Sequence, residues 1–184
     1  MSGERKTPSA RFNLIAIGAI AALPLVGSYL LFVLWKPTAF VNYGELIGPT
    51  LLIELQTGAA PELKGKWVFL MADSGRCDAY CLRKLYAMRQ VRLTQGKDMD
   101  RIERAWLLDD GVTPAASVTD EYRGTRLLAA NPALLDKLPA AASVRDHIYL
   151  VDPLGNVMMR FPRDADPSRM KKDIARLLRA SRIG

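Results

Sequence analysis

The longest uncharged stretch of the chain lies near its N-terminus. Residues 12–35 contain no Asp, Glu, Lys or Arg, and only Asn13 and Ser28 among them are clearly polar. A helix of about 20 apolar residues is long enough to cross the hydrocarbon core of a bilayer. The stretch also has no polar stripe, which a helix covering a soluble core would show. The pattern therefore predicts a transmembrane helix over 12–35.

Basic residues flank this stretch unequally. Arg5, Lys6 and Arg11 precede it, whereas only Lys36 follows closely. Because Lys and Arg near a membrane helix stay on the cytoplasmic side, residues 1–11 are expected to form a cytoplasmic tail. The flanks thus predict a single-pass protein of the cell inner membrane with its C-terminal domain in the periplasm.

A cleaved signal peptide is the alternative interpretation of this stretch. Ala19-Ile20-Ala21 resembles a cleavage site. The apolar sequence continues well past it, and the whole run exceeds the roughly 7–15 residues of a signal-peptide core. The length therefore favours an uncleaved anchor.

The pattern changes after the predicted membrane helix. Glycine and proline recur through 36–64, which predicts a linker and an irregular lead-in that could hold a short strand at 51–55. Residues 65–184 are expected to form one domain. Its first element is the apolar run 66–72, which is typical of a strand buried on both faces.

The rest of this domain alternates strand and helix patterns. Strands are expected at 102–108, 147–151 and 157–161, and helices at 78–94, within 114–138 (one around 132–137) and from Asp166 onward. The turn residues 152–156 predict an antiparallel hairpin between the last two strands. The order strand, helix, strand, helix, hairpin, helix predicts a thioredoxin-like α/β fold, with a central mixed sheet flanked by helices and a right-handed crossover.

The two cysteines, Cys77 and Cys81, lie between the first buried strand and its helix. Residues four apart share a helix face, so both sulfurs can reach one point. There they could form a short-loop disulfide or bind one soft metal ion, and a helix N-terminus favours the thiolate that either chemistry needs. A purely structural disulfide is the alternative. However, a bridge across so short a loop constrains the unfolded chain little, which favours a functional pair.

Three segments of the chain resemble the Sco/SenC family of thioredoxin-like assembly proteins for cytochrome c oxidase. They are Asp73-Ser74-Gly75-Arg76-Cys77 with Cys81, Trp106-Leu107-Leu108-Asp109-Asp110 with Thr113-Pro114, and Ile148-Tyr149-Leu150-Val151-Asp152-Pro153-Leu154-Gly155. The similarity covers roughly residues 64–162. The family has a membrane anchor and a C-x3-C copper motif after the first core strand. The resemblance implies a copper metallochaperone, with copper as the metal and a cytochrome c oxidase subunit or another respiratory assembly protein as partner.

The resemblance also implies a metal-ligand set, from which this sequence departs. Cys77 and Cys81 would be two ligands, and His147, the only histidine, is the candidate third. The family's histidine lies several residues before its Tyr-Leu strand, whereas His147 lies two before Tyr149. In a strand that difference can turn the ring to the other face. An exposed, solvated His147 is the alternative. The family also has proline after each cysteine, where this chain has Asp78 and Leu82.

Two other functions need only the cysteines. In a thiol–disulfide oxidoreductase, Cys77 and Cys81 would be the catalytic pair, one attacking and one resolving. In a non-catalytic scaffold, their disulfide would be structural. The C-x3-C spacing, with Pro139 well before His147, departs from the C-x2-C and nearby proline of general oxidoreductases. The spacing thus favours a metallochaperone or a dedicated reductant.

Charge and composition argue against several other classes of function. The net charge of +7 reflects the N-terminal flank and the C-terminal residues Arg169, Lys171, Lys172, Arg176, Arg179 and Arg182. No module with stacking aromatic residues accompanies them, so no nucleic-acid partner is expected. They are expected on a solvated helix face that could lie near anionic lipid. A single histidine argues against a catalytic triad or a His-rich zinc site.

Overall fold

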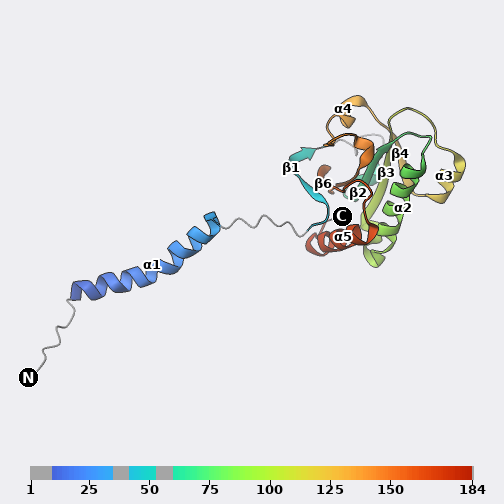
Figure 1. Cartoon of the computed structure of the whole chain (residues 1–184). Helices are drawn as coiled ribbons and strands as arrows, with labels where there is room; N and C mark the ends of the chain where they lie inside the picture. Colours follow the sequence, from blue (N-terminus) through green and yellow to red (C-terminus); the bar gives the residue numbers. More distant parts are fainter. Residues whose placement is uncertain (1–9, 35–41, 53–59, 184) are drawn as a thin grey trace, which may run out of the picture. The chain divides into compact units, whose positions relative to one another are not determined.

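The structure is a computed structural model that describes residues 10–34, 42–52 and 60–183. The chain divides into two compact units, 1–41 and 42–184 (Figure 1), and each is described by itself.

The first unit contains the helix α1, Ala10–Leu34, with Pro24 inside it. Its residues Arg11–Leu34 are long and apolar enough to cross a membrane. This confirms a candidate membrane helix where the sequence predicts one. The helix α1 begins two residues before the predicted range of 12–35. Trp35 and the flank 1–9 lie outside the described residues, and the orientation across the membrane stays a prediction.

The second unit is built on one mixed sheet. Among the described residues it has six strands in the order β1-β6-β5-β2-β3-β4. Their bounds are β1 Glu45–Leu52, β2 Trp67–Asp73, β3 Ile102–Leu108, β4 Thr125–Ala129, β5 Ile148–Val151 and β6 Asn156–Arg160. β2, β3 and β4 run parallel, while β5 pairs antiparallel with both β2 and β6. The predicted hairpin is therefore confirmed.

Helices flank this sheet. They are α2 Ala79–Leu93, α3 Ala116–Glu121, α4 Pro132–Leu135 and α5 Pro167–Ala180, with 3-10 turns η1 Pro61–Leu63, η2 Gly96–Arg101 and η3 Val144–Asp146. The buried residues of α2 and α5 join one core cluster with Phe69 and Met71. A second cluster, which holds Leu70 and Tyr149, lies on the opposite face. Because every residue of β2 is buried, successive side chains alternate between these clusters. The fold is thus the predicted thioredoxin-like arrangement.

The helices expected within 114–138 are confirmed as α3 and α4, but the sequence did not predict the strand between them. This strand, β4, pairs with β3. β4 is an edge strand of five residues, of which only Leu128 is buried. Such a short segment has no alternation strong enough to predict a strand, so its pairing with β3 decides its conformation.

The segment 36–64, which the sequence predicts to be an irregular lead-in, contains a regular strand. β1 spans Glu45–Leu52 and pairs with β6 through a register shift, so the compact unit begins at Asn42 instead of residue 65. Asp173 of α5 holds this lead-in, because its carboxylate accepts the N–H groups of Tyr43 and Gly44 at 2.7 and 2.8 Å. A side chain at Gly44 would collide with Met159. Residues 53–55 of the predicted strand lie outside the described residues.

We expect replacement of Asp173 by alanine to destabilise the domain. The carboxylate is buried, and its removal would leave two N–H donors without their acceptor, which costs about 2 kcal/mol. Urea unfolding of the full chain in detergent, followed by tryptophan fluorescence, would measure this change. Asp120→Ala, which breaks an exposed ion pair with Arg123, is the control and should change stability by less than about 0.5 kcal/mol. Equal effects of the two variants would contradict the assignment.

Candidate functional site

Cys77 and Cys81 form a disulfide between the end of β2 and the first turn of α2. Their Cα atoms are 5.1 Å apart. Cys77 keeps 8% of its surface exposed, whereas Cys81 is fully buried. The sequence prediction that both sulfurs meet at one point is therefore confirmed. Of the two, Cys77 is the one that a reaction partner can approach.

Asp78 sets the local geometry of the pair. It is the N-cap of α2, and its Oδ1 accepts the N–H groups of Tyr80 and Cys81 at 2.9 Å each. The Cys81 N–H bond is the main reason that the pKa of this carboxyl is lowered. The helix therefore begins directly after Cys77, with Cys81 in its first turn. A carboxylate occupies the helix N-terminus that would otherwise stabilise a thiolate.

The loop before Cys77 is held from the neighbouring strand. Asp110, which follows β3, accepts hydrogen bonds from Ser74 Oγ at 2.5 Å and from the Gly75 N–H at 3.1 Å. These bonds, that of Ser74 first, lower the pKa of Asp110 to about 2. A Cβ atom at Gly75 would lie 1.9 Å from the carbonyl oxygen of Val112, so only glycine fits. The carboxyl ends of β2 and β3 thus build the loop together.

Cys77 has an unusual backbone conformation. Its φ is 39°, in the left-handed region, and only one other described residue apart from glycine, Asp164, has a positive φ. For a residue with a Cβ atom this region costs about 1–2 kcal/mol. The loop holds it through the Cys77 N–H, which donates to the carbonyl oxygen of Ser74 at 3.1 Å. Backbone strain of this kind is concentrated at functional sites.

A buried ion pair flanks the disulfide in sequence. Lys84 Nζ lies 2.7 Å from Asp73 Oδ2, and the two side chains are 5% and 9% exposed. Burial lowers the pKa of Lys84, and the Asp73 carboxylate opposes that shift. Asp73 ends β2, and Lys84 lies one turn beyond Cys81. The pair therefore ties α2 to the strand that leads into the loop.

The sequence reading of this helix missed Lys84. Charged side chains usually lie on the solvated side of a helix, but Lys84 is buried among the core positions of α2. The signal was its place three residues after Cys81 and one before Leu85, within the buried stripe. A lysine buried in such a stripe requires an acidic partner. The sequence does not identify this partner, because Asp73 comes close to Lys84 only in the folded chain.

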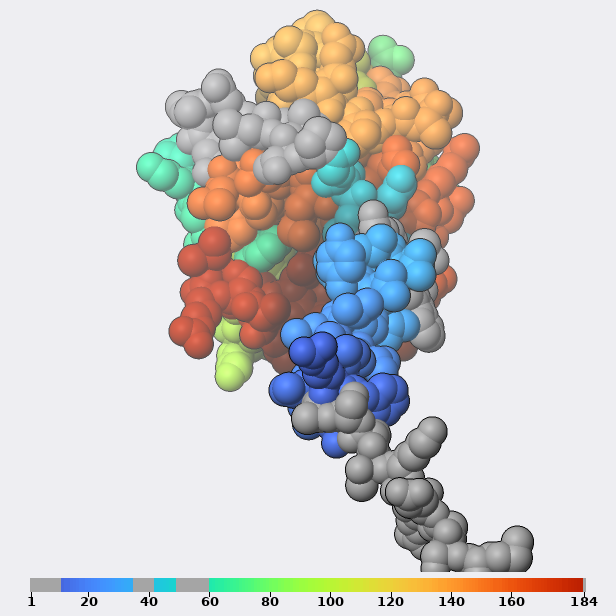
Figure 2. Space-filling view, turned by 90° about the vertical axis from the view of Figure 1, so that its left-hand side faces the viewer, coloured from blue at the N-terminus to red at the C-terminus, as the bar shows by residue number. Residues whose placement is uncertain are grey.

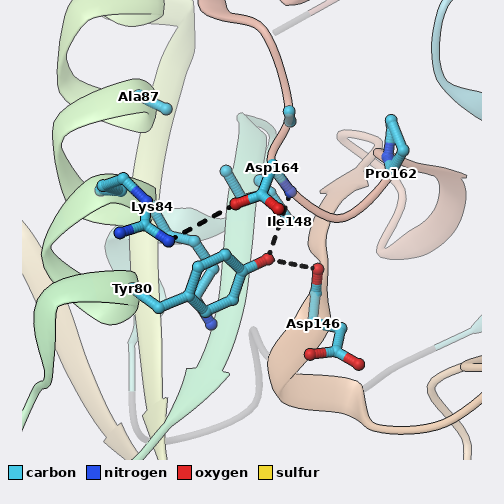
Figure 3. A pocket seen from close by; sticks show the side chains of 9 residues that line it. Tyr80, Lys84, Ala87, Asp146, Ile148, Pro162 and Asp164 are labelled. Carbon is cyan, nitrogen blue, oxygen red and sulfur yellow. Dashed lines mark hydrogen bonds and ion pairs between the residues drawn. The ribbon is translucent and has the colours of Figure 1, made fainter.

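A recess of about 130 Å³ lies between α2 and the segments around Asp146 and Asp164 (Figure 3). Its lining comes from α2 and from the segments 146–148 and 162–165. Tyr80, which lies between the cysteines in sequence, donates its hydroxyl to the carbonyl oxygen of Asp146 at 2.8 Å. Burial raises the pKa of this tyrosine. The recess is large enough for about one side chain, and Tyr80 connects its wall to the helix turn that carries Cys81.

His147 does not face the cysteines. Its Nδ1 lies 2.9 Å from the carbonyl oxygen of Phe161, and its ring packs edge-on against Tyr149 at 6.0 Å. Tyr149 belongs to the core cluster on the sheet face opposite that of Cys81. The carboxylate of the neighbouring Asp146 lies 3.7 Å from Arg163. In the described part of the chain, no group of three or more His, Cys, Asp or Glu side chains is placed to hold a metal.

The sheet order, the parallel β2-α2-β3 unit and the cysteine pair at the start of α2 define a thioredoxin-like domain. Residues 67–181 match the family model described as "Transmembrane-like, thioredoxin-like, C-terminal domain", and the chain belongs to this family. No curated protein sequence matches the chain.

Solved structures with the same fold include Sco proteins. Copper-bound yeast Sco1 has a TM-score of 0.52 at 17% identity, over 73% of this chain and 94% of that chain. Copper-bound ScoI of Arabidopsis thaliana has a TM-score of 0.50 at 15% identity, over 76% and 99%. Apo Sco1 from Thermus thermophilus has a TM-score of 0.50 at 14% identity, over 78% and 98%. At these identities the likeness shows the fold that the sequence resemblance implied.

We expect Asp78 to tune the thiol of Cys77. In the reduced protein, Asp78→Ala should lower the pKa of the Cys77 thiol, because it removes a negative charge and frees two N–H donors for the thiolate. It should also cost about 1 kcal/mol of stability through the lost N-cap. The pH dependence of alkylation by iodoacetamide would measure the pKa. Asp78→Asn keeps an acceptor and removes only the charge, so it separates the two causes. An unchanged pKa in both variants would contradict the assignment.

Proposed function

We propose that this protein is a membrane-anchored thiol–disulfide exchange protein that acts outside the cytoplasm on a partner with paired cysteines. The observation that carries the proposal is the Cys77–Cys81 disulfide at the start of α2, with Cys77 8% exposed and Cys81 fully buried. The strained backbone of Cys77 and the recess lined by Tyr80 support it. The predicted topology supports it too, because disulfides persist outside the cytoplasm.

The exchange follows from the different exposure of the two cysteines. In the reduced protein, the thiolate of Cys77 attacks one sulfur of a partner disulfide and forms a mixed disulfide, while the partner's other sulfur leaves as a thiolate. The thiolate of Cys81 then attacks the Cys77 sulfur. This step closes the Cys77–Cys81 disulfide and releases the partner as a dithiol. Two electrons pass to the partner, and the disulfide form is the product state of the chain.

Copper transfer is the second candidate function. Here copper is cargo, and the protein is a Sco-like metallochaperone for assembly of cytochrome c oxidase, with an oxidase subunit or another respiratory assembly protein as partner. Two thiolates suit Cu(I), so reduced Cys77 and Cys81 could hold it without a third ligand. For His147 to act as a third ligand, its ring would have to give up its contact with Tyr149 and turn toward the cysteines. Copper is proposed as the metal because the similar structure of yeast Sco1 contains bound copper.

The exchange function is tested by trapping the partner. Cys81→Ser leaves the attacking thiol without its resolving partner, so a mixed disulfide should accumulate and should be visible on a non-reducing gel of membranes. Cys77→Ser leaves only a buried thiol and should trap much less. The double serine variant is the control. Equal trapping by both single variants, or full function of the double variant, would leave the disulfide with a structural role only.

Copper binding is tested separately with the reduced chain. If copper is the cargo, Cu(I) titration should give one ion per chain, and either cysteine-to-serine change should abolish tight binding. His147→Ala should weaken binding by less than about tenfold, below the 10–100-fold typical of outer-shell partners, because the ring lies on the other face. No binding by the reduced wild type would exclude copper transfer and leave thiol exchange standing.

A further inference from the structure

The exposed side of α5 carries an excess of positive charge. Met170, Ile174 and Leu178 are buried in the core. On the opposite side of the helix, an exposed basic stripe recurs at helical spacing, formed by Arg169, Lys172, Arg176 and Arg179. Figure 2 shows this helix, in red, on the surface of the domain.

One acidic residue lies in the same segment as this stripe. It is Asp173, the one acid between 167 and 183, which is buried, accepts the N–H groups of Tyr43 and Gly44, and lies 3.7 Å from Arg176 of the stripe. Lys171 and Arg182 add two further exposed cations. The helix therefore presents a surface that suits an extended array of anions.

The chain enters the domain along this same helix. Besides the two hydrogen bonds to Asp173, the hydroxyl of Tyr43 accepts the N–H of Asp166 at 3.0 Å, and the Arg169 guanidinium lies 4.0 Å from the centre of the Tyr43 ring. The lead-in is thereby fixed to α5 at residues 43 and 44.

The membrane anchor limits how far this helix can be from lipid. Seven residues, 35–41, separate the end of α1 from Asn42. The nine residue steps from Leu34 to Tyr43, where the chain meets α5, span at most about 32 Å even when fully extended. With α1 across the bilayer, the point where the chain joins α5 stays within that distance of the headgroups. Such a tether gives the basic stripe an effective concentration on the order of millimolar at the membrane surface, so weak contacts are sufficient.

We propose that the basic stripe of α5 binds anionic phospholipid headgroups and so holds the domain against the bilayer. Each Lys or Arg near an anionic surface contributes about 1 kcal/mol, a factor of about five in the equilibrium. Besides Arg176, which Asp173 partly neutralises, the stripe supplies three such residues on one side of the helix. The inference rests on the membrane anchor and does not depend on the chemistry of the cysteines.

Amine labelling of the full chain in nanodiscs tests this contact. Discs of pure phosphatidylcholine are compared with discs that also contain phosphatidylglycerol, and acylation of Lys171 and Lys172 is read by mass spectrometry. We expect their labelling to fall at least about fivefold in the anionic discs. Raising the salt to about 1 M, where the screening length is about 3 Å, should restore it. Lys137, which follows α4, is the internal reference and should not change (Figure 1).

Charge-reversal variants sharpen the test. Lys172→Glu/Arg179→Glu should abolish the protection of Lys171 in anionic discs. Lys64→Glu/Lys137→Glu makes the same change in net charge on exposed residues next to η1 and α4, and should leave the protection of Lys171 intact. The effect of salt on lysine labelling is measured on the wild-type chain, so this part of the test does not depend on whether a variant folds. Equal labelling of wild type in both kinds of disc would overturn the lipid assignment and favour an acidic protein as the partner. Protection by neutral lipid alone, or protection unaffected by salt, would overturn it as well.

Discussion

The complete burial of β2 is the constraint on which the rest of the structure depends. All seven of its residues are buried, and its side chains alternate between the two core clusters of the sheet. Such a strand has no solvent-facing side, so it must lie inside the sheet with layers on both faces. Its carboxyl end then has a fixed position, and the loop to Cys77 starts from there. α2, which follows the loop, is tied back to the strand through Lys84 and Asp73.

Carboxylates, more than metal ligands, organise the site at the end of this strand. Asp110 holds the loop before Cys77, and Asp78 caps the helix after it. Both place negative charge near the pair, which opposes formation of a thiolate. The strained conformation of Cys77 lies between these two anchors. The site is therefore a thiol pair in a preformed loop, and its reactivity depends on the balance between the helix N-terminus and two acids.

The position of His147 illustrates how one register decides between functions. The ring lies on the face of Tyr149, and the cysteines lie with the cluster on the other face. His147 directly precedes β5 as the C-cap of η3, and its ring packs edge-on against Tyr149. This contact with Tyr149 is the structural reason for proposing thiol exchange ahead of copper transfer.

The sequence by itself determined the elements whose signals are local: the apolar helix α1, the run of β2, the capped helices α2 and α5, and the cysteine pair between β2 and α2. Each follows from apolar periodicity, an N-cap or close spacing along the chain. Only the tertiary structure decided that β1 and β4 are edge strands, that Lys84 is buried against Asp73, and that His147 turns away from the cysteines. These outcomes depend on partners distant in sequence, because edge pairing, compensation of a buried charge and strand register are set by neighbours that the chain meets only when folded.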